Sequence, residues 1–185
     1  MKRVVIAGLL VAACRESPPS PAPEPPRFGL GRAATSAEIA ALDDDVQPDG
    51  TGLPPGRGTV AEGAAIYAAR CASCHGVTGR EGPVGVLVGG GQPLGFRVGW
   101  RPSTATPATV GNLYPHATTL YDYVHRTMPW AQPGSLEPDE VYSLVAWLLH
   151  QNDIVPADAA LDATTLPKID MPARGRFTEA RSRGR

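Results

Sequence analysis

The stretch Cys71-Ala72-Ser73-Cys74-His75 decides how the rest of this sequence is interpreted. On a helical turn, positions i, i+3 and i+4 lie on one face, so the two thiols and the imidazole would converge. Two cysteines at this spacing, followed directly by histidine, are the attachment signature of c-type haem. The thiols form thioethers to the haem vinyl groups and the histidine binds the iron. The sequence therefore predicts one covalent haem c, held by Cys71 and Cys74, with His75 as an axial ligand.

Two other interpretations of this stretch are less favoured. A dithiol pair of the thioredoxin kind would need a βαβ pattern, which the sequence lacks. A structural zinc site needs four ligands, and the one remaining cysteine, Cys14, stands alone far from this pair. A bare dithiol exchange protein stays as an alternative, and it would carry no haem.

The haem iron also needs a sixth ligand or an open position. Apart from the initiator, the methionines are Met128 and Met171. Met128 lies 53 positions after His75, just before a final amphipathic segment, and a thioether there would stabilise ferrous iron. Met128 is therefore the predicted second axial ligand and Met171 the weaker candidate. The remaining histidines, which are minor candidates, are His116, His125 and His150.

The N-terminus is typical of an export signal. Residues 1–3 are basic at two of three positions, and residues 4–13 form an apolar run of ten, too short to span a bilayer of about 30 Å. The run ends in Val-Ala-Ala-Cys, similar to the lipobox of bacterial lipoproteins, in which the cysteine is acylated. We expect residues 1–14 to be a lipoprotein signal ending at a lipidated Cys14, and the protein to be anchored in the bacterial periplasm.

Composition limits the kind of structure that the remaining residues can form. Residues 15–27 are rich in proline, which is typical of an extended linker. The whole chain has 185 residues with 21 glycines and 20 prolines, so we expect a small core and much irregular structure. Its formal net charge of −1 argues against nucleic acid as a partner.

Local patterns predict three helices and no convincing strand. Thr59 and Glu62 form a capping-box pattern at the start of a helix that runs into Cys71. A second helix is expected over Thr119–Thr127, and a third from Pro138, a residue suited to the first helical position. Apolar residues recur on the third helix at helical spacing: Val141, Leu144, Val145 and Leu148.

The order of these features resembles a class I cytochrome c. The elements are a helix with Gly63 and Tyr67, then the CxxCH stretch, Met128-Pro129, and a helix with Leu144 and Trp147. The resemblance implies an all-α class I cytochrome c fold with long loops over residues 58–155, in which Gly63 lets Leu144 and Trp147 approach closely. Residues 28–57 would be an extended N-terminal segment. Residues 156–185 would be a C-terminal extension with a basic tail.

A narrower resemblance covers most of residues 28–177. The stretches PDGTGLPPG (48–56), YPHATTLYDY (114–123), DEVY (139–142) and MPAR (171–174) are similar to the cytochrome subunits of bacterial sulfite and sulfane dehydrogenases. The sequence departs from that family at Tyr114, where Trp is frequent, at Ala173, where Asn is frequent, and at Glu137, which replaces a Thr cap. The resemblance implies a partner subunit that carries a molybdenum cofactor.

The function expected from these features is electron transfer. The haem would accept single electrons from the molybdenum subunit and pass them to another cytochrome or an oxidase. Two alternatives are a free-standing membrane-tethered electron carrier and a ligand-binding haem sensor with an open iron position. Candidate contacts to the haem edge or its propionates, which could equally be ordinary packing residues, are Arg101, Tyr114, Tyr121 and Trp130.

Overall fold

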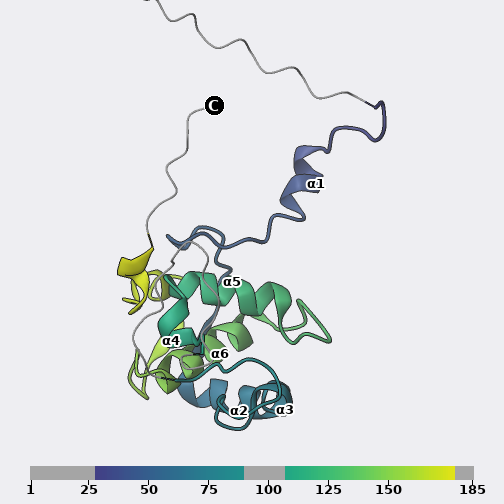
Figure 1. Ribbon diagram of the computed structural model, residues 1–185. Coiled ribbons are helices and arrows are strands. Elements are labelled where there is room, and N and C mark those ends of the chain that lie inside the picture. The colour runs from purple at the N-terminus through teal and green to yellow at the C-terminus, as the bar shows by residue number, and fades with distance from the viewer. Residues whose placement is uncertain (1–27, 90–106, 178–185) are drawn as a thin grey trace, which may run out of the picture.

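The computed structural model of this chain describes residues 28–89 and 107–177 (Figure 1). The predicted signal segment with Cys14, the Pro-rich linker and Arg101 therefore lie outside the described residues. The described part is mostly helical, as the sequence predicts, with two short strands. Its elements, in chain order, are α1 (Ser36–Ala40), β1 (Arg57–Thr59), α2 (Val60–Arg70), α3 (Ala72–His75), α4 (Val110–Leu113), α5 (Ala117–Thr127), α6 (Pro138–Gln151), β2 (Ala160–Asp162) and the 3₁₀ turns η1 (Leu166–Lys168) and η2 (Arg174–Arg176).

Helix α2 begins where the sequence predicts. The Thr59 hydroxyl accepts a hydrogen bond from the backbone N–H of Glu62 at 3.3 Å, and the Glu62 carboxylate accepts one from the Thr59 N–H at 2.9 Å. This reciprocal capping box satisfies two donors that the first turn of a helix leaves open. The helix ends at Arg70, and Cys71, the first residue of the haem-attachment turn, is its C-cap.

Helix α6 is the centre of the fold. It begins at Pro138, as predicted, and the Glu140 carboxylate accepts a hydrogen bond from the Glu137 N–H at 2.9 Å. All nine residues from Val141 to Leu149 are buried, so the predicted stripe of four is only part of the buried surface. The reason is that α2, α5 and both strands all contact α6.

The crossing of α2 and α6 depends on Gly63. A Cβ atom at Gly63 would lie 2.0 Å from the carbonyl oxygen of Ser143 and 2.8 Å from the Cβ of Trp147. Close approach to Trp147 is confirmed, while the other nearest residue is Ser143 instead of the expected Leu144. One turn further on, the ring of Tyr67 stacks on Trp147 with centroids 3.9 Å apart.

Segments that precede α2 and follow α6 in the sequence complete the core. Strands β1 and β2 pair antiparallel, with Gly58 opposite Leu161. Three residues per strand are too few to show alternation, which is why the sequence predicts no strand. Before β1, the chain is tied to the helices by bonds from Val46 N–H to Asp122 (3.0 Å) and from the Tyr142 hydroxyl to the carbonyl of Pro54 (2.9 Å). After β2, further side chains are buried in the same core: Leu166, Met171 and Ala173.

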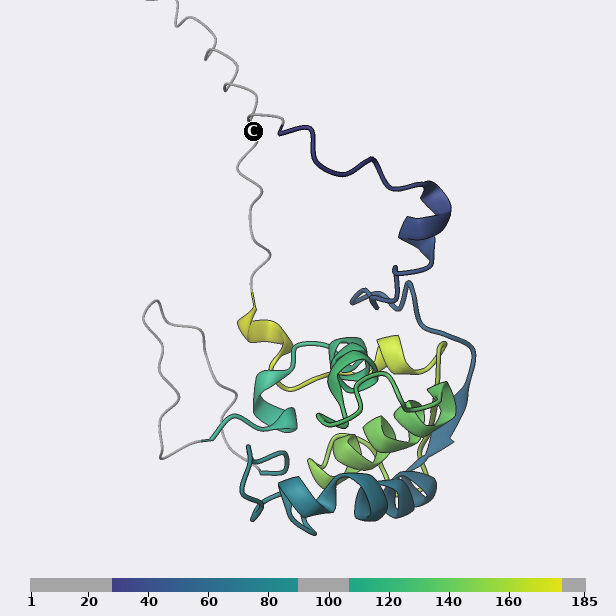
Figure 2. The ribbon, with the colours of Figure 1, turned by 90° about the vertical axis from the view of Figure 1, so that its right-hand side faces the viewer.

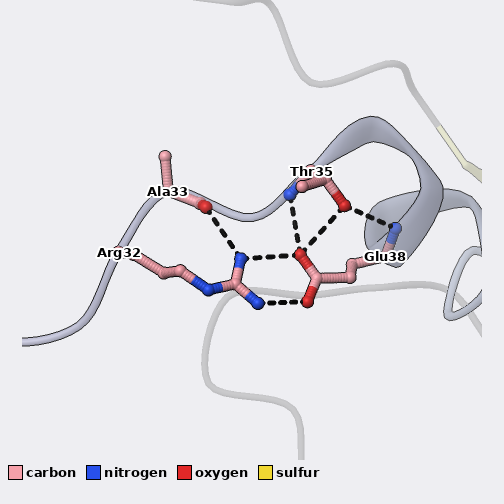
Figure 3. A network of polar contacts seen from close by, with 4 residues as sticks. All are labelled: Arg32, Ala33, Thr35 and Glu38. Atoms are coloured by element: carbon pink, nitrogen blue, oxygen red, sulfur yellow. Dashed lines mark hydrogen bonds and ion pairs between the residues drawn. The ribbon is translucent and has the colours of Figure 1, made fainter.

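Residues 28–45, the N-terminal arm, project from this body and meet it at their C-terminal end. There a hydrogen bond with Asp122, and then the charges of Asp44 and Asp45, raise the pKa of Arg126 on α5. Every residue of the arm is exposed, whereas Val46 is buried. Figures 1 and 2 show α1 standing away from the packed helices in both views. The arm's order is local: Glu38 accepts hydrogen bonds from the N–H of Thr35 at 2.8 Å and from the guanidinium of Arg32 at 2.8 Å (Figure 3). The Arg32 guanidinium, and then Thr35, lower the pKa of Glu38 to about 2.

Candidate haem site

The turn that follows α2 brings the three predicted haem-binding residues together. The N–H of Cys74 donates to the carbonyl of Cys71 at 3.1 Å, and the N–H of His75 donates to the same carbonyl at 3.0 Å. Cys74 and His75 therefore lie on the short helix α3, and Cys71 is the residue directly before it. The Tyr67 hydroxyl donates to the carbonyl of Gly76 at 2.9 Å and so ties the end of the turn to α2.

All three side chains line a cavity of about 730 Å³. This volume falls within the range of roughly 300–1,000 Å³ that is usual for cofactor sites. Its wall is mainly apolar and comes from α2, α3, α4, α5, α6 and the loops between them. Among the lining residues are Val86, Leu87, Val110, Leu113, Leu120, Val124, Leu136, Leu144 and Leu148. A dry wall of this kind, with thiols, an imidazole and a thioether converging on it, fits a porphyrin.

The orientation of His75 is set by a second residue. Its Nδ1 lies 3.0 Å from the carbonyl oxygen of Gly85. Because a carbonyl oxygen only accepts hydrogen bonds, Nδ1 carries the proton, and the lone pair of Nε2 is left for iron. Sequence reasoning identified His75 and missed Gly85, since a backbone acceptor has no residue-type signal.

The loop that supplies Gly85 is itself held in place. The Glu81 carboxylate accepts hydrogen bonds from the N–H groups of Thr78 and Arg80, each at 3.0 Å. The hydroxyl and N–H of Thr78 lower the pKa of Glu81 to about 2. Close packing adds to this, because a Cβ at Gly82 would lie 2.2 Å from the carbonyl oxygen of Cys74. The loop is thus folded tightly against the attachment turn.

Met128 reaches the same cavity from a segment distant in the sequence. It follows the last residue of α5, and its N–H donates to the carbonyl of Val124 at 3.1 Å. The side chain is half-buried and lines the cavity together with Pro129. Met171 is buried in the core and does not line the cavity. The histidines at 116, 125 and 150 do not line it either, so among the described candidates Met128 is the sixth ligand that the geometry supports.

Of the three described residues that were predicted as haem-edge contacts, two line the cavity and one does not. Tyr114 and Trp130 line the cavity, and burial raises the pKa of the Tyr114 phenol to about 12. Tyr121 does not line it: its fully buried ring faces Tyr142, with centroids 4.6 Å apart, in the core between α5 and α6. Of the two interpretations that the sequence left open for Tyr121, haem contact and ordinary packing, the structure supports packing, since the α5 residues that line the cavity are Leu120, Tyr123 and Val124. Arg101 lies outside the described residues.

Asn152 is a site residue that the sequence did not reveal. Its Oδ1 accepts hydrogen bonds from the N–H groups of Gly89 and Gly111, both at 3.2 Å. Its Nδ2 donates to the carbonyls of Leu87 (3.2 Å) and Leu148 (2.8 Å). One side chain at the end of α6 thus joins the loop, α4 and α6 behind the cavity wall. A single Asn after a helix is common, so the sequence carries no signal for this role.

The Cys71 thiol does not resemble the attacking thiol of a dithiol exchange protein. Burial raises the pKa of the Cys71 thiol to about 11. In redox-active Cys-x-x-Cys sites the attacking cysteine has a lowered pKa, because the thiolate is the nucleophile. Cys71 is therefore suited to a permanent bond inside a closed site rather than to thiol exchange.

Comparison with known proteins agrees with this site. The cytochrome c family model matches residues 60–152, half of the chain. The chain therefore belongs to the cytochrome c family, whose members bind haem c covalently and carry electrons. Its structure is similar to that of a chain in the crystal structure of the sulfane dehydrogenase SoxCD from Paracoccus pantotrophus, with 38% sequence identity and a TM-score of 0.68. This match covers 85% of the present chain and 75% of the other. No curated protein matches the sequence.

Proposed function

We propose that this chain is the single-haem subunit of a two-component sulfane or sulfite dehydrogenase. In this function it accepts electrons from a molybdenum-containing partner and passes them to a further cytochrome or an oxidase. The observation that supports the partner most directly is the similarity to a chain of SoxCD over 85% of this sequence, well beyond the family domain at 60–152. The single CxxCH stretch in the sequence supports one haem.

The residues that line the cavity have separate roles in the proposed electron transfer. Bound haem supplies the reversible one-electron couple between ferric and ferrous iron. Cys71 and Cys74 would hold it covalently, and His75, oriented by the carbonyl of Gly85, would offer Nε2 to the iron. Met128 would offer a thioether as the other ligand, which favours the ferrous state relative to a second histidine. The apolar wall excludes water, so the change of charge occurs in a site that needs little reorganisation.

The rim of the cavity supports the approach of a protein donor. Three exposed apolar side chains line the cavity: Val84 (48% exposed), Tyr123 (45%) and Trp130 (83%). Large exposed apolar groups around a redox site are typical of a surface that a partner covers. A short-lived complex between redox partners can form on a small apolar patch, without a cluster of charged residues at the interface.

The direct test is capture of the partner. The full-length tagged holoprotein is used as bait in extract from its own host, and the retained protein is analysed for molybdenum. Addition of sulfite or thiosulfate to the isolated complex should then reduce the haem, as seen in its absorption spectrum. A free-standing carrier would retain no molybdenum protein, and this outcome would refute the proposal.

A ligand-binding sensor ranks below the free-standing carrier as an alternative, and the position of Met128 opposes it. A thioether at the cavity would occupy the sixth coordination position, whereas a sensor keeps that position open. Carbon monoxide separates the two, since it binds readily to ferrous haem with an open position. We expect the wild-type ferrous protein to resist carbon monoxide.

We also propose that the mature protein is attached to a membrane by lipid on Cys14 and faces the bacterial periplasm. The support is the sequence of residues 1–14 alone. Among the described residues, no helix is long and apolar enough to cross a membrane. The Pro-rich linker at 15–27 would then hold the haem domain away from the lipid surface.

A further inference from the structure

The N-terminal arm carries half of the large apolar side chains that the described residues expose. On the arm these are Phe28 (79% exposed), Leu30 (89%), Ile39 (57%) and Leu42 (84%). The others are Val77, Val84, Tyr123 and Trp130, three of which line the haem cavity. The arm is therefore a second apolar surface, separate in sequence from the cavity rim.

Nothing in the described part of this chain covers the arm. Residues 28–45 are all exposed, and α1 buries none of its own residues. A helix of five residues is too short to be stable alone in water. The capping box of Thr35 and Glu38 and the ion pair of Glu38 with Arg32 nevertheless give it a defined shape (Figure 3). A preformed but uncovered apolar segment lowers the ordering cost of binding to something else.

Charge indicates what kind of surface would cover it. Residues 28–45 hold one arginine against Glu38 and the run Asp43–Asp45. The aspartates are crowded enough that hydrogen bonding with Asp45, and then its charge, raise the pKa of Asp43. An acidic run next to Leu42 is repelled by anionic lipid. A protein groove that is apolar at its centre and basic at its rim is complementary to it.

The extent of the structural similarity points to the same kind of partner. Coverage of 85% of 185 residues is about 157 residues, whereas the family domain at 60–152 accounts for roughly 93. Residues after 152 can supply at most about 33 of the remaining 64 or so. About 31 or more of the matched residues must then precede residue 60. If this matched segment is continuous with the family domain, it begins at about residue 29. The similarity to a chain of a two-component dehydrogenase therefore extends into the arm.

We propose that residues 28–45 are a docking arm that binds the molybdenum-containing subunit of the dehydrogenase, at a groove with an apolar floor and a basic rim. This inference rests on the proposed function. Ile39 and Leu42 enter the groove, and Asp43–Asp45 pair with the rim. The arm keeps the two subunits together while the haem cavity, through its own rim, makes the contact across which electrons pass.

The test compares two double variants of the full-length holoprotein. Ile39→Ser/Leu42→Ser removes one apolar side chain of α1 and another two residues after its end, and Ala37→Ser/Ala40→Ser introduces serines at two exposed alanines of α1. Affinity for the purified molybdenum subunit, isolated by capture on the tagged holoprotein, is measured for each by surface plasmon resonance. We expect at least a roughly tenfold loss for the first variant, as for hot-spot truncations, and less than about twofold for the second. Unchanged haem spectra and melting temperatures confirm that both variants are folded.

The outcomes separate the arm from the function on which it rests. If the wild type retains a molybdenum subunit and both variants bind it equally well, the docking arm is refuted and the proposed function stands. If the wild type retains none, the proposed function fails and the arm fails with it. Two other occupants are tested in parallel, with vesicles of phosphatidylethanolamine and phosphatidylglycerol and by sedimentation of the protein alone. A loss of vesicle binding or of self-association, with partner affinity unchanged, would also overturn the proposal.

Discussion

Replacement of Gly63 by alanine tests the helix crossing on which the haem site is built. At an open position in a helix this change stabilises a protein by about 1 kcal/mol. Here the new Cβ would lie 2.0 Å from the Ser143 carbonyl oxygen, whereas ordinary contact begins at 3.4 Å, so α2 would have to move away by about 1.4 Å. The obstacle is backbone, which no side-chain rotation relieves. Overpacking of this kind costs about 1–3 kcal/mol.

The upper end of this overpacking cost, less the gain in helix propensity, lowers the free energy of unfolding by about 2 kcal/mol. For a domain of this size, this corresponds to a fall in Tm of roughly 8 °C. The assay is thermal unfolding of the holoprotein, followed at the same time by circular dichroism and by the haem absorption band. Gly175→Ala is the matched control, because nothing lies within 4 Å of its Cβ position, and it should stay within about 0.5 kcal/mol. A Gly63→Ala protein at least as stable as the wild type would refute the close crossing.

Four further predictions concern the site and the anchor. Met128→Ala should keep the covalent haem but lose the weak near-infrared charge-transfer band of thioether-bound ferric iron; if the band survives, Met128 is not the ligand. Asn152→Ala leaves two backbone N–H groups without acceptors and should lower the free energy of unfolding by roughly 3 kcal/mol, read from urea denaturation. Cys14→Ser should release the protein from membranes, and sedimentation with lipid despite the change would contradict the anchor. The lowered pKa of Glu81, about 2, means that its bonds to Thr78 stabilise the haem-side loop above the unfolded pKa of 4.5 and are lost as the pH falls towards 2, which amide exchange of Thr78 should show.

The parts of the site that the sequence predicts are those with local signals. The haem turn needs residues three and four apart, the capping box at Thr59 and Glu62 is three apart, and Pro138 marks the first turn of α6 directly. Each of these patterns is contained within one turn of helix, so tertiary context does not change it. Helix α5 begins at Ala117, two residues before the predicted Thr119. The sequence does not signal this start, because the side chain of the N-cap residue, His116, makes no capping hydrogen bond.

The parts that the sequence does not predict depend on contacts between distant residues. Gly85 acts through its carbonyl, and Asn152 through four hydrogen bonds to three separate segments, so neither has a residue-type pattern. The sequence left open whether Tyr121 contacts the haem or packs in the core, because only the rotation of α5 about its axis decides which side chains border the cavity. Tyr123 lines the cavity and Tyr121 faces α6.

The hydrophobic core of this protein is incomplete where it borders the cavity. Leu120, Leu136 and Leu144 come from α5, the following loop and α6, and all three are buried yet border the same cavity of about 730 Å³. Side chains that face such a space lack partner atoms on one side, and the lost dispersion contacts weaken the core. The polypeptide, with few aromatic residues, does not fill this space itself, so a flat apolar cofactor is needed to complete the packing. Attachment through Cys71 and Cys74 would make the haem a permanent part of this core and hold it against the side chains proposed as iron ligands.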